Sequence, residues 1–191
     1  MAQPVPESKL LRISDRDKWR EWLKKNRKSE DEIWLVYAKK HTGKPRISYN
    51  DAVEEALCFG WIDSIVKTID EDSFAQRFSV RKSKSSYSQP NRERLRALVE
   101  QGKVMPDVLE SLPDLSEDDF RIAPDILEGI KANKQAWKNF QGFSEPYIRI
   151  RISYIEAGRE RSEIFEKRLA NFISKTEKNK KFGYGGIEKY Y

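Results

Sequence analysis

The pattern of apolar residues changes at Gly60, and this change constrains the fold more than any other feature of the chain. Before Gly60, Ser48 is a suitable N-cap and apolar residues recur at helical spacing, at Ala52, Val53, Ala56 and Leu57. From residue 61 to residue 80 the apolar residues alternate instead, with a polar turn at residues 70–73. The pattern predicts a helix that ends at Gly60, followed by a hairpin with strands over residues 62–69 and 74–80.

One helix and one strand are predicted before the helix that ends at Gly60. Ser14 is a plausible N-cap for a helix over residues 15–27, whose apolar face carries Trp19, Trp22 and Leu23. Residues 33–40 begin as a short apolar run and end in charge, which suits a largely buried strand.

After the hairpin, Ser88 can cap a third helix that tolerates Pro90 in its first turn and ends at Gly102. A short helix to Leu112 follows. We expect residues 1–112 to form one domain.

The remainder of the chain has a different character. Residues 113–123 are acidic and contain few apolar residues, which is typical of a linker. Residues 124–175 have helical periodicity throughout, with successive helices from Pro124, around Trp137, and over residues 146–157 and 159–174. Residues 176–191 are rich in lysine and glycine and are predicted to form a flexible tail.

Composition excludes several classes of protein. The chain has 191 residues, 36% of them charged, and a mean hydropathy of −0.81. Its longest apolar run, residues 33–38, is far shorter than the roughly 18 residues of a membrane span. Residues 1–9 lack the apolar region of a signal peptide, and a single cysteine cannot form an internal disulfide. We expect a cytoplasmic monomer that does not insert into membranes.

The net charge is concentrated in one segment. Residues 77–96 contain seven basic residues and one acidic residue, so they account for the whole net charge of +6. Such a basic stripe is the electrostatic footprint of a nucleic-acid-binding protein. The alternative is that Arg92, Arg94 and Arg96 form the solvated face of a helix. The sequence leaves both interpretations open.

The chain has one cysteine, Cys58, and one histidine, His41. Cys58 precedes a predicted helix C-terminus, where the dipole raises a thiol pKa, so we expect a buried core cysteine rather than a nucleophile. A zinc site needs further cysteine or histidine ligands, which the chain lacks. We therefore predict no metal and no cofactor. Residues 41–44, HTGK, lack the first glycine of a phosphate loop. The acids at residues 70–72 could hold Mg²⁺ or Ca²⁺, but a solvated turn is the favoured interpretation.

Asp63 is the acid that packing does not require. It follows the bulky Trp61 at the start of a strand, and Arg81 at the end of the neighbouring strand could pair with it. The pair would close the sheet as a salt bridge. Alternatively, Trp61 would form the floor of a pocket and Arg81 would bind an anion there. The predicted ligand-binding surface is completed by side chains of the following loop and helix start, Ser85, Tyr87, Ser88 and Asn91.

The same segment supports a second hypothesis, a nucleic-acid-binding surface on which Tyr87 stacks against a base or a sugar. Its candidate residues are Arg77, Arg81, Lys82, Lys84, Tyr87, Arg92 and Arg96.

Residues 52–63 read AVEEALCFGWID and form the most specific motif of the chain. Together with Trp22-Leu23, Ile33-Trp34-Leu35, Lys39-Lys40, Arg77-Phe78, Arg81, Ser85, Ser88, Asn91, Leu98 and Gly102, this motif resembles the YdeI/OmpD-associated family, also described as bacteriocin-protection proteins. The resemblance covers residues 15–112 and, more weakly, residues 124–173. It implies an α+β N-terminal part with a helical C-terminal part and no established catalytic activity.

The chain departs from the family pattern at several positions. Ser79-Val80 stand where the family usually has Thr-Pro, and Tyr87 stands where a tryptophan is expected. Ala157-Gly158 and Ser162-Glu163 replace the usual Ala-Lys and Thr-Arg. If that lysine and arginine bind something in relatives, this chain has lost the function.

These observations lead to one preferred interpretation of fold and function. The fold class is α+β, a small mixed α/β part with a sheet that contains the hairpin, followed by an all-helical module. The function is expected to be non-enzymatic, that of a stress or bacteriocin-protection protein that binds an anionic ligand or partner. Direct capture of a cationic peptide is disfavoured by the net charge of +6. An enzyme that acts on a small anionic substrate, with Asp63 as acid or base, is the third hypothesis.

Overall fold

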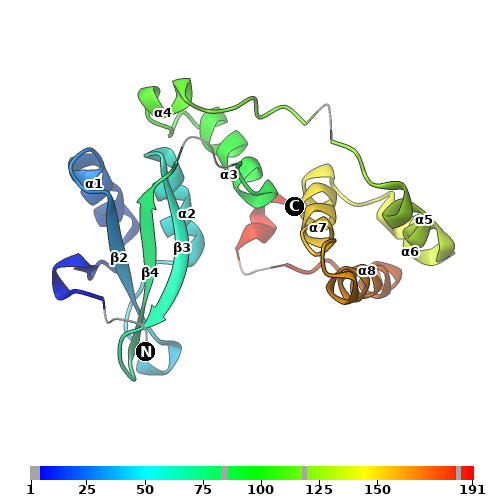
Figure 1. Cartoon of the computed structure of the whole chain (residues 1–191), viewed down its shortest axis with the longest axis horizontal. Coiled ribbons are helices and arrows are strands. Elements are labelled where there is room, and N and C mark those ends of the chain that lie inside the picture. Colours follow the sequence, from blue (N-terminus) through cyan, green and yellow to red (C-terminus); the bar gives the residue numbers. More distant parts are fainter. Residues whose placement is uncertain (1–4, 83–85, 118–119, 184–185) are drawn as a thin grey trace. The chain divides into compact units, whose positions relative to one another are not determined.

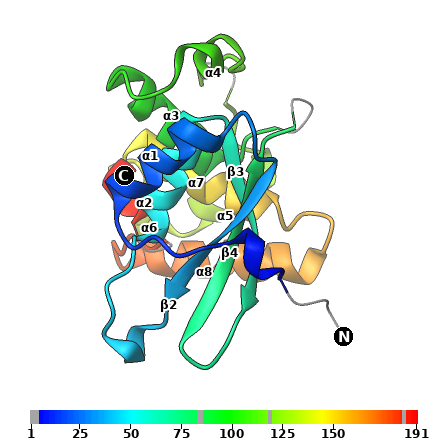
Figure 2. The same cartoon turned by 90° about the vertical axis from the view of Figure 1, so that its left-hand side faces the viewer.

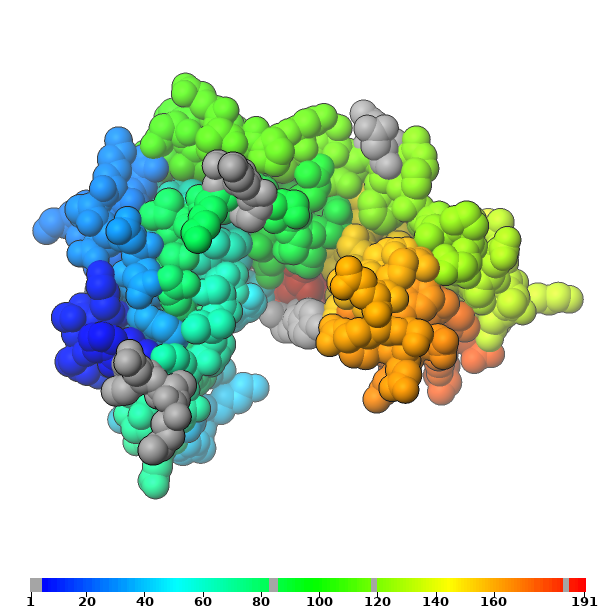
Figure 3. Space-filling model, viewed as in Figure 1, coloured from blue at the N-terminus to red at the C-terminus, as the bar shows by residue number. Residues whose placement is uncertain are grey.

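The computed structural model describes residues 5–82, 86–117, 120–183 and 186–191, which are coloured along the sequence in the cartoon (Figure 1) and in the space-filling view (Figure 3). The chain divides into two compact units: unit 1 comprises residues 1–87 and 94–113, and unit 2 comprises residues 88–93 and 114–191. Helix α3 (Gln89–Glu100) contributes its first residues to unit 2 and the rest to unit 1. Among the described residues, no helix has both the length and the apolar character needed to cross a membrane.

Unit 1 contains a four-stranded sheet with the strand order β1-β2-β4-β3. Its strands are β1 (Leu10–Leu11), β2 (Glu32–Ala38), β3 (Trp61–Thr68) and β4 (Ser73–Val80). β4 pairs antiparallel with both β2 and β3, which confirms the predicted hairpin and the predicted strand before it. β1 pairs parallel with β2 and was not predicted, because two residues are too few to show a period.

Helices α1 (Arg16–Asn26) and α2 (Tyr49–Cys58) pack together against one face of the sheet (Figure 2). The indole of Trp19 on α1 lies 5.4 Å from the ring of Phe78 on β4, and its N–H donates to the carbonyl of Ala52 at 3.0 Å. The side chains of Trp19 and Phe78 are both completely buried. The apolar stripes predicted from helical spacing therefore form the core of unit 1.

The helix starts in unit 1 depend on single polar side chains. Ser48 caps α2 as predicted, because its hydroxyl accepts a hydrogen bond from the Asp51 amide at 3.1 Å. The predicted cap of α1 was wrong by one residue. The helix begins at Arg16, so Asp15 rather than Ser14 holds the N-cap position, and its carboxylate accepts from the Lys18 amide at 2.9 Å.

Gly60 separates α2 from β3 in the conformation that its position predicts. Its φ of 75° lies in the left-handed region, which glycine adopts without a Cβ penalty. A shift in the pairing register follows between Asp63 and Val66, so β3 contains a bulge. Beyond the hairpin, α3 and the short α4 (Pro106–Glu110) occupy the predicted places.

Unit 2 is helical, as predicted. It contains α5 (Pro124–Ala132), α6 (Lys134–Phe140), α7 (Glu145–Glu156) and α8 (Ser162–Glu177). Helix α8 starts later than predicted because residues 158–161 form a turn, in which the Arg161 amide donates to the Gly158 carbonyl at 2.9 Å. The core of the unit is built from buried side chains of all four helices, including Ile126, Phe140, Tyr147 and Phe172.

Residues after α8 also contact this core. Ile187 is only 2% exposed, in a short 3-10 turn (Ile187–Tyr190). The Phe182 amide donates to the hydroxyl of Tyr147 at 3.3 Å, and the ring of Tyr191 lies 4.7 Å from that of Tyr147. The flexibility expected of residues 176–191 stays a prediction.

Candidate functional site

Asp63 lies on β3, where two neutral side chains donate to its carboxylate. The hydroxyl of Tyr49 on α2 donates to Oδ2 at 2.8 Å, and Nε2 of Gln76 on β4 donates to the same oxygen at 3.3 Å. Burial and the nearby charge of Asp63 raise the pKa of Tyr49 above its usual range. Within the described residues Asp63 and Arg81 form no ion pair, so that expectation was wrong. Asp63 lies opposite Phe78 in the register, whereas Arg81 lies beyond the end of β4.

Trp61 is a core residue. Its side chain is 1% exposed and its ring meets that of Trp22 edge to face, with 5.8 Å between the centroids. The indole nitrogen is buried and has no hydrogen-bond acceptor among the described residues. Trp61 therefore offers almost no surface to a ligand, and the predicted pocket floor is filled by α1.

Arg81 is held by an aromatic ring instead of a carboxylate. Its guanidinium carbon lies 3.7 Å from the centroid of the Tyr87 ring, a cation–π contact. Its backbone N–H donates to the carbonyl of Gly60 at 3.0 Å, which fixes the start of the loop. Burial raises the pKa of Tyr87 despite the positive charge of Arg81. Lys84 and Ser85, two of the predicted site residues, lie outside the described residues.

The remaining members of the predicted surface belong to unit 2. Ser88 is exposed and immediately precedes α3, where its carbonyl accepts from the amides of Asn91 and Arg92. The side chain of Asn91 is 8% exposed in the first turn of the helix. Within unit 1, the structure thus brings together Arg81 and Tyr87, but it does not join Trp61 and Asp63 to them as one exposed surface.

Several arginines of the basic segment bind groups of the protein itself. Arg77 donates through Nε to Glu32 on β2 at 2.8 Å, and Arg92 donates to Glu117 at 2.9 Å. Arg94 is 5% exposed and donates to the side-chain oxygen of Asn50 at 2.6 Å. Arg92 and Arg94 therefore do not form the solvated helix face that composition suggested as the alternative, and all three arginines already donate to internal acceptors.

Cys58 is completely buried, which confirms the core cysteine. Burial raises the pKa of the thiol to about 11, so it stays protonated at neutral pH. His41 lies apart from it and pairs with Asp72 of the β3–β4 turn, with 3.1 Å between Nε2 and Oδ1. The two side chains therefore do not form a nucleophile–base pair.

Sequence reasoning missed a buried ion-pair cluster within the AVEEALCFGWID motif. The side chains of Glu54 and Glu55 on α2 are each 3% exposed. Arg16 donates to Glu55 through Nε at 2.6 Å and lies 3.2 Å from Glu54, while Arg20 donates to Glu55 at 2.6 Å. Two adjacent acids inside an otherwise apolar helical stripe were the signal, because buried acids need cationic partners.

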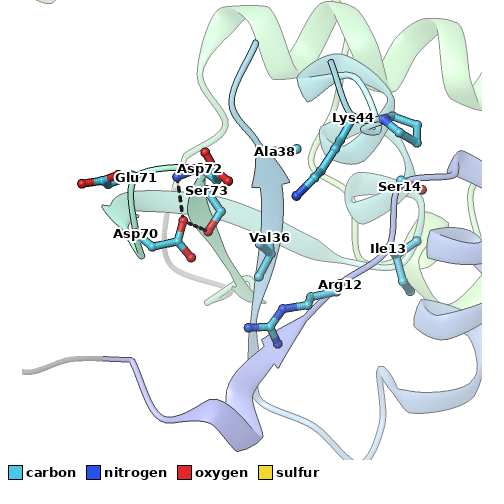
Figure 4. A pocket seen from close by; sticks show the side chains of 11 residues that line it. Arg12, Ile13, Ser14, Val36, Ala38, Lys44, Asp70, Glu71, Asp72 and Ser73 are labelled. Carbon is cyan, nitrogen blue, oxygen red and sulfur yellow. Dashed lines mark hydrogen bonds between the residues drawn. The ribbon is translucent and has the colours of Figure 1, made fainter. Parts of the chain in front are cut away.

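An open pocket of about 740 Å³ lies in unit 1, and none of the predicted site residues lines it. It is formed by residues 12–14 before α1, by Val36 and Ala38 of β2, by residues 44–45 and by the β3–β4 turn at residues 70–73. Figure 4 shows the acids of the turn on one side and Lys44 on the other, with the β2 residues between them. The volume falls in the range of about 300–1,000 Å³ that is common for small-molecule sites.

Local hydrogen bonds fix the charged walls of this pocket. Oδ1 of Asp70 accepts from the Asp72 amide and from the Ser73 hydroxyl, each at 2.8 Å, and these bonds lower the pKa of Asp70. Arg12 donates through Nη1 to Glu7 at 2.5 Å. In the described parts of the chain, no group of three or more His, Cys, Asp or Glu side chains is arranged to hold a metal ion.

The comparisons with known proteins divide the chain at nearly the same place as its two units. Residues 11–111 match a family described as a domain of unknown function (DUF8412), and residues 119–179 match the family described as bacteriocin-protection, YdeI or OmpD-associated. The AVEEALCFGWID motif thus lies in the first match, although it suggested the second family. No curated protein and no solved structure matches the chain. The C-terminal region is similar to the YdeI/OmpD-associated, bacteriocin-protection family over residues 119–179. Since the first match spans more than half of the chain, the protein belongs to the DUF8412 family.

Proposed function

We propose that this protein is a non-enzymatic binding protein with a role related to bacteriocin protection, and that Arg81 binds an anionic group of its ligand or partner. The observation that carries the proposal is the stacked pair of Arg81 and Tyr87. The ring orients the guanidinium at 3.7 Å, and no carboxylate of the described residues neutralises it. An arginine held in this way keeps its planar set of N–H donors for a carboxylate or phosphate.

The surroundings of the candidate nucleophiles and acids favour binding over catalysis. Cys58 is buried with a raised pKa, and the carboxylate of Glu55 is shared between two arginines. Asp63 accepts from the neutral side chains of Tyr49 and Gln76, and Trp61 beside it is buried. None of these side chains combines an accessible reactive atom with an activating partner.

A small anion is favoured over a nucleic acid because Arg77, Arg92 and Arg94 already bind internal acceptors. A nucleic-acid surface gains affinity from each phosphate that a free cation neutralises. With these arginines engaged, the segment offers fewer contacts than its composition suggests.

The test is a calorimetric titration of the full chain with pyrophosphate and, separately, with a short single-stranded oligonucleotide. Arg81→Gln is expected to weaken pyrophosphate binding about tenfold or more, because a hydrogen bond to a charged group contributes about 1.5–3 kcal/mol. Tyr87→Leu should weaken it less, since the cation remains but its support is lost. Arg46→Gln is the control, because Arg46 is another exposed arginine of unit 1, and in the described part of the chain it donates only to the Ala38 carbonyl. Equal affinities of wild type and Arg81→Gln would reject the proposal.

A further inference from the structure

The pocket between the N-terminal segment, β2 and the β3–β4 turn has a distribution of charge that the proposed function does not use. The turn carries the acids Asp70 and Asp72 on one side, Lys44 lies on the opposite side, and Arg12 also lines the pocket (Figure 4). Val36 of β2 lies between them with other apolar groups of the lining. All of these residues belong to unit 1, so the pocket is complete within one unit.

Each charged wall keeps atoms free for a ligand. Both hydrogen bonds to Asp70 use Oδ1, and the contact of His41 with Asp72 also uses Oδ1. Within the described residues, Oδ2 of each acid therefore accepts no hydrogen bond, although the charges of Lys39 and Arg12 act on Asp70. The Lys44 ammonium likewise has no partner among these residues, because only the backbone amide of Lys44 takes part in a hydrogen bond.

The internal contacts also hold these groups in place. The Ser73 hydroxyl and the Asp72 amide fix the carboxylate of Asp70 and favour its ionised form. The carbonyl of Asp70 accepts from Nζ of Lys39 at 2.9 Å, which ties the turn to the end of β2. A charged group that is already oriented loses less conformational entropy when it binds a ligand.

From this arrangement we infer that the pocket is a binding site for a zwitterion with an apolar body, an amino-acid derivative or a short peptide with free termini. The ammonium of the ligand pairs with the carboxylates of Asp70 and Asp72, and its carboxylate pairs with Lys44 and Arg12. Its apolar side chains cover Val36 and Ile13. A purely anionic ligand would meet the acids of the turn, and a purely cationic one would meet Lys44.

The volume agrees with this assignment. About 740 Å³ exceeds the space that a single amino acid fills and accommodates a peptide of a few residues. The site is separate from Arg81, and the inference does not depend on the proposed anion site.

The experiment uses three matched probes with the full chain: dileucine, N-acetyl-dileucine, which lacks the ammonium, and dileucinamide, which lacks the carboxylate. Binding is measured by isothermal titration calorimetry. We expect dileucine to bind at least about tenfold more tightly than either blocked form, because each block removes one charged hydrogen-bonding group.

Variants of the pocket assign each end of the ligand. Lys44→Gln should weaken dileucine and leave dileucinamide unchanged, whereas Asp70→Asn should weaken dileucine and leave N-acetyl-dileucine unchanged. Lys24→Gln, at an exposed lysine of α1 outside the pocket, is the control. Because each variant is judged by the ratio between two probes, a loss of folded protein does not imitate the expected result.

Three results would overturn the inference. They are no binding of dileucine by the wild type, equal affinity for dileucine and its blocked forms, and an equal loss of all three probes in Lys44→Gln. A preference for dileucinamide over dileucine would assign the pocket to cations alone and would also reject the zwitterion.

Discussion

Replacing Glu55 by glutamine tests whether the paired acids of the AVEEALCFGWID motif stabilise the fold. Glutamine keeps the size of the side chain but removes its charge and replaces one acceptor oxygen by a donor NH₂ group. Glu55 accepts from Arg16 and from Arg20, each at 2.6 Å, and its side chain is 3% exposed. One of the two arginines must therefore face a donor where it now meets an acceptor.

The expected loss follows from the burial of the three side chains. Breaking a fully buried ion pair costs about 3–5 kcal/mol. Arg16 and Arg20 retain 30% and 31% of their side-chain exposure, so water compensates part of the loss. Arg16 also keeps its contact with Asp51 at 2.5 Å. We expect Glu55→Gln to lower the free energy of unfolding of unit 1 by about 2–3 kcal/mol.

Urea denaturation followed by tryptophan fluorescence measures this loss, because Trp19, Trp22, Trp34 and Trp61 all lie in unit 1 and only Trp137 lies in unit 2. For a unit of this size, about 2–3 kcal/mol corresponds to a fall in melting temperature of roughly 10 °C or more. Glu21→Gln, at an exposed position of α1 with no partner among the described residues, should change stability by less than about 0.5 kcal/mol. If the two variants were equally stable, the acids of the motif would not have the structural role assigned here.

Three further predictions concern the turn, the thiol and the basic segment. Gly60→Ala should destabilise unit 1 by more than Gly102→Ala in urea denaturation. Both glycines have a positive φ, where an alanine costs about 1–2 kcal/mol, but of the two only Gly60 would bring a new Cβ against a side chain, at 3.3 Å from Cγ2 of Val108. Cys58, which is buried and has a pKa raised to about 11, should react with a thiol reagent at pH 8 only after unfolding, and rapid labelling of the native protein would contradict this. The stability gained from the protonated thiol is fully present below the unfolded pKa of about 8.5 and is lost as the pH rises through 11. Binding of a single-stranded oligonucleotide by residues 77–96 should have a log–log salt slope no steeper than about 3, because at least three of the seven basic residues, Arg77, Arg92 and Arg94, have internal partners. A slope near 5 would contradict this prediction, since it requires all seven basic residues to contact phosphates.

Local patterns in the sequence were sufficient to predict most of the fold. The change of period at Gly60 located both strands of the hairpin. The helical spacing before Gly60 and the alternation after it each extend over enough residues to be told apart. The strand β1 could not be found in this way, because its two residues are defined only by pairing with Trp34 and Leu35. The cap of α1 could not be assigned either, because Ser14 and Asp15 are both good caps and only the geometry of the first turn selects one.

The candidate site was harder to predict because it depends on contacts between distant parts of the chain. Asp63 and Arg81 come close in a simple hairpin drawn from the sequence, but the actual register places Asp63 beside Tyr49 and Gln76. The pocket at residues 70–73 is formed by four segments, and no pattern within any one of them indicates that they meet. In the sequence, Lys44 stands out only through the likeness of HTGK to the end of a phosphate loop. Its position opposite the acidic turn depends on the folded chain and could not be predicted.

The role of each carboxylate in unit 1 is determined by the groups that donate to it. Glu55 is neutralised by two arginines, which makes it a structural acid, and the most specific motif of the sequence is therefore devoted to the core. Asp63 receives two neutral donors on one oxygen. Asp70 is held ionised by donors that use one oxygen only, and among the described residues its other oxygen, beside the pocket, accepts no hydrogen bond. We therefore assign the binding capacity of unit 1 to acids that are oriented by donors on one oxygen and keep the other oxygen for a ligand, and these acids lie in the β3–β4 turn.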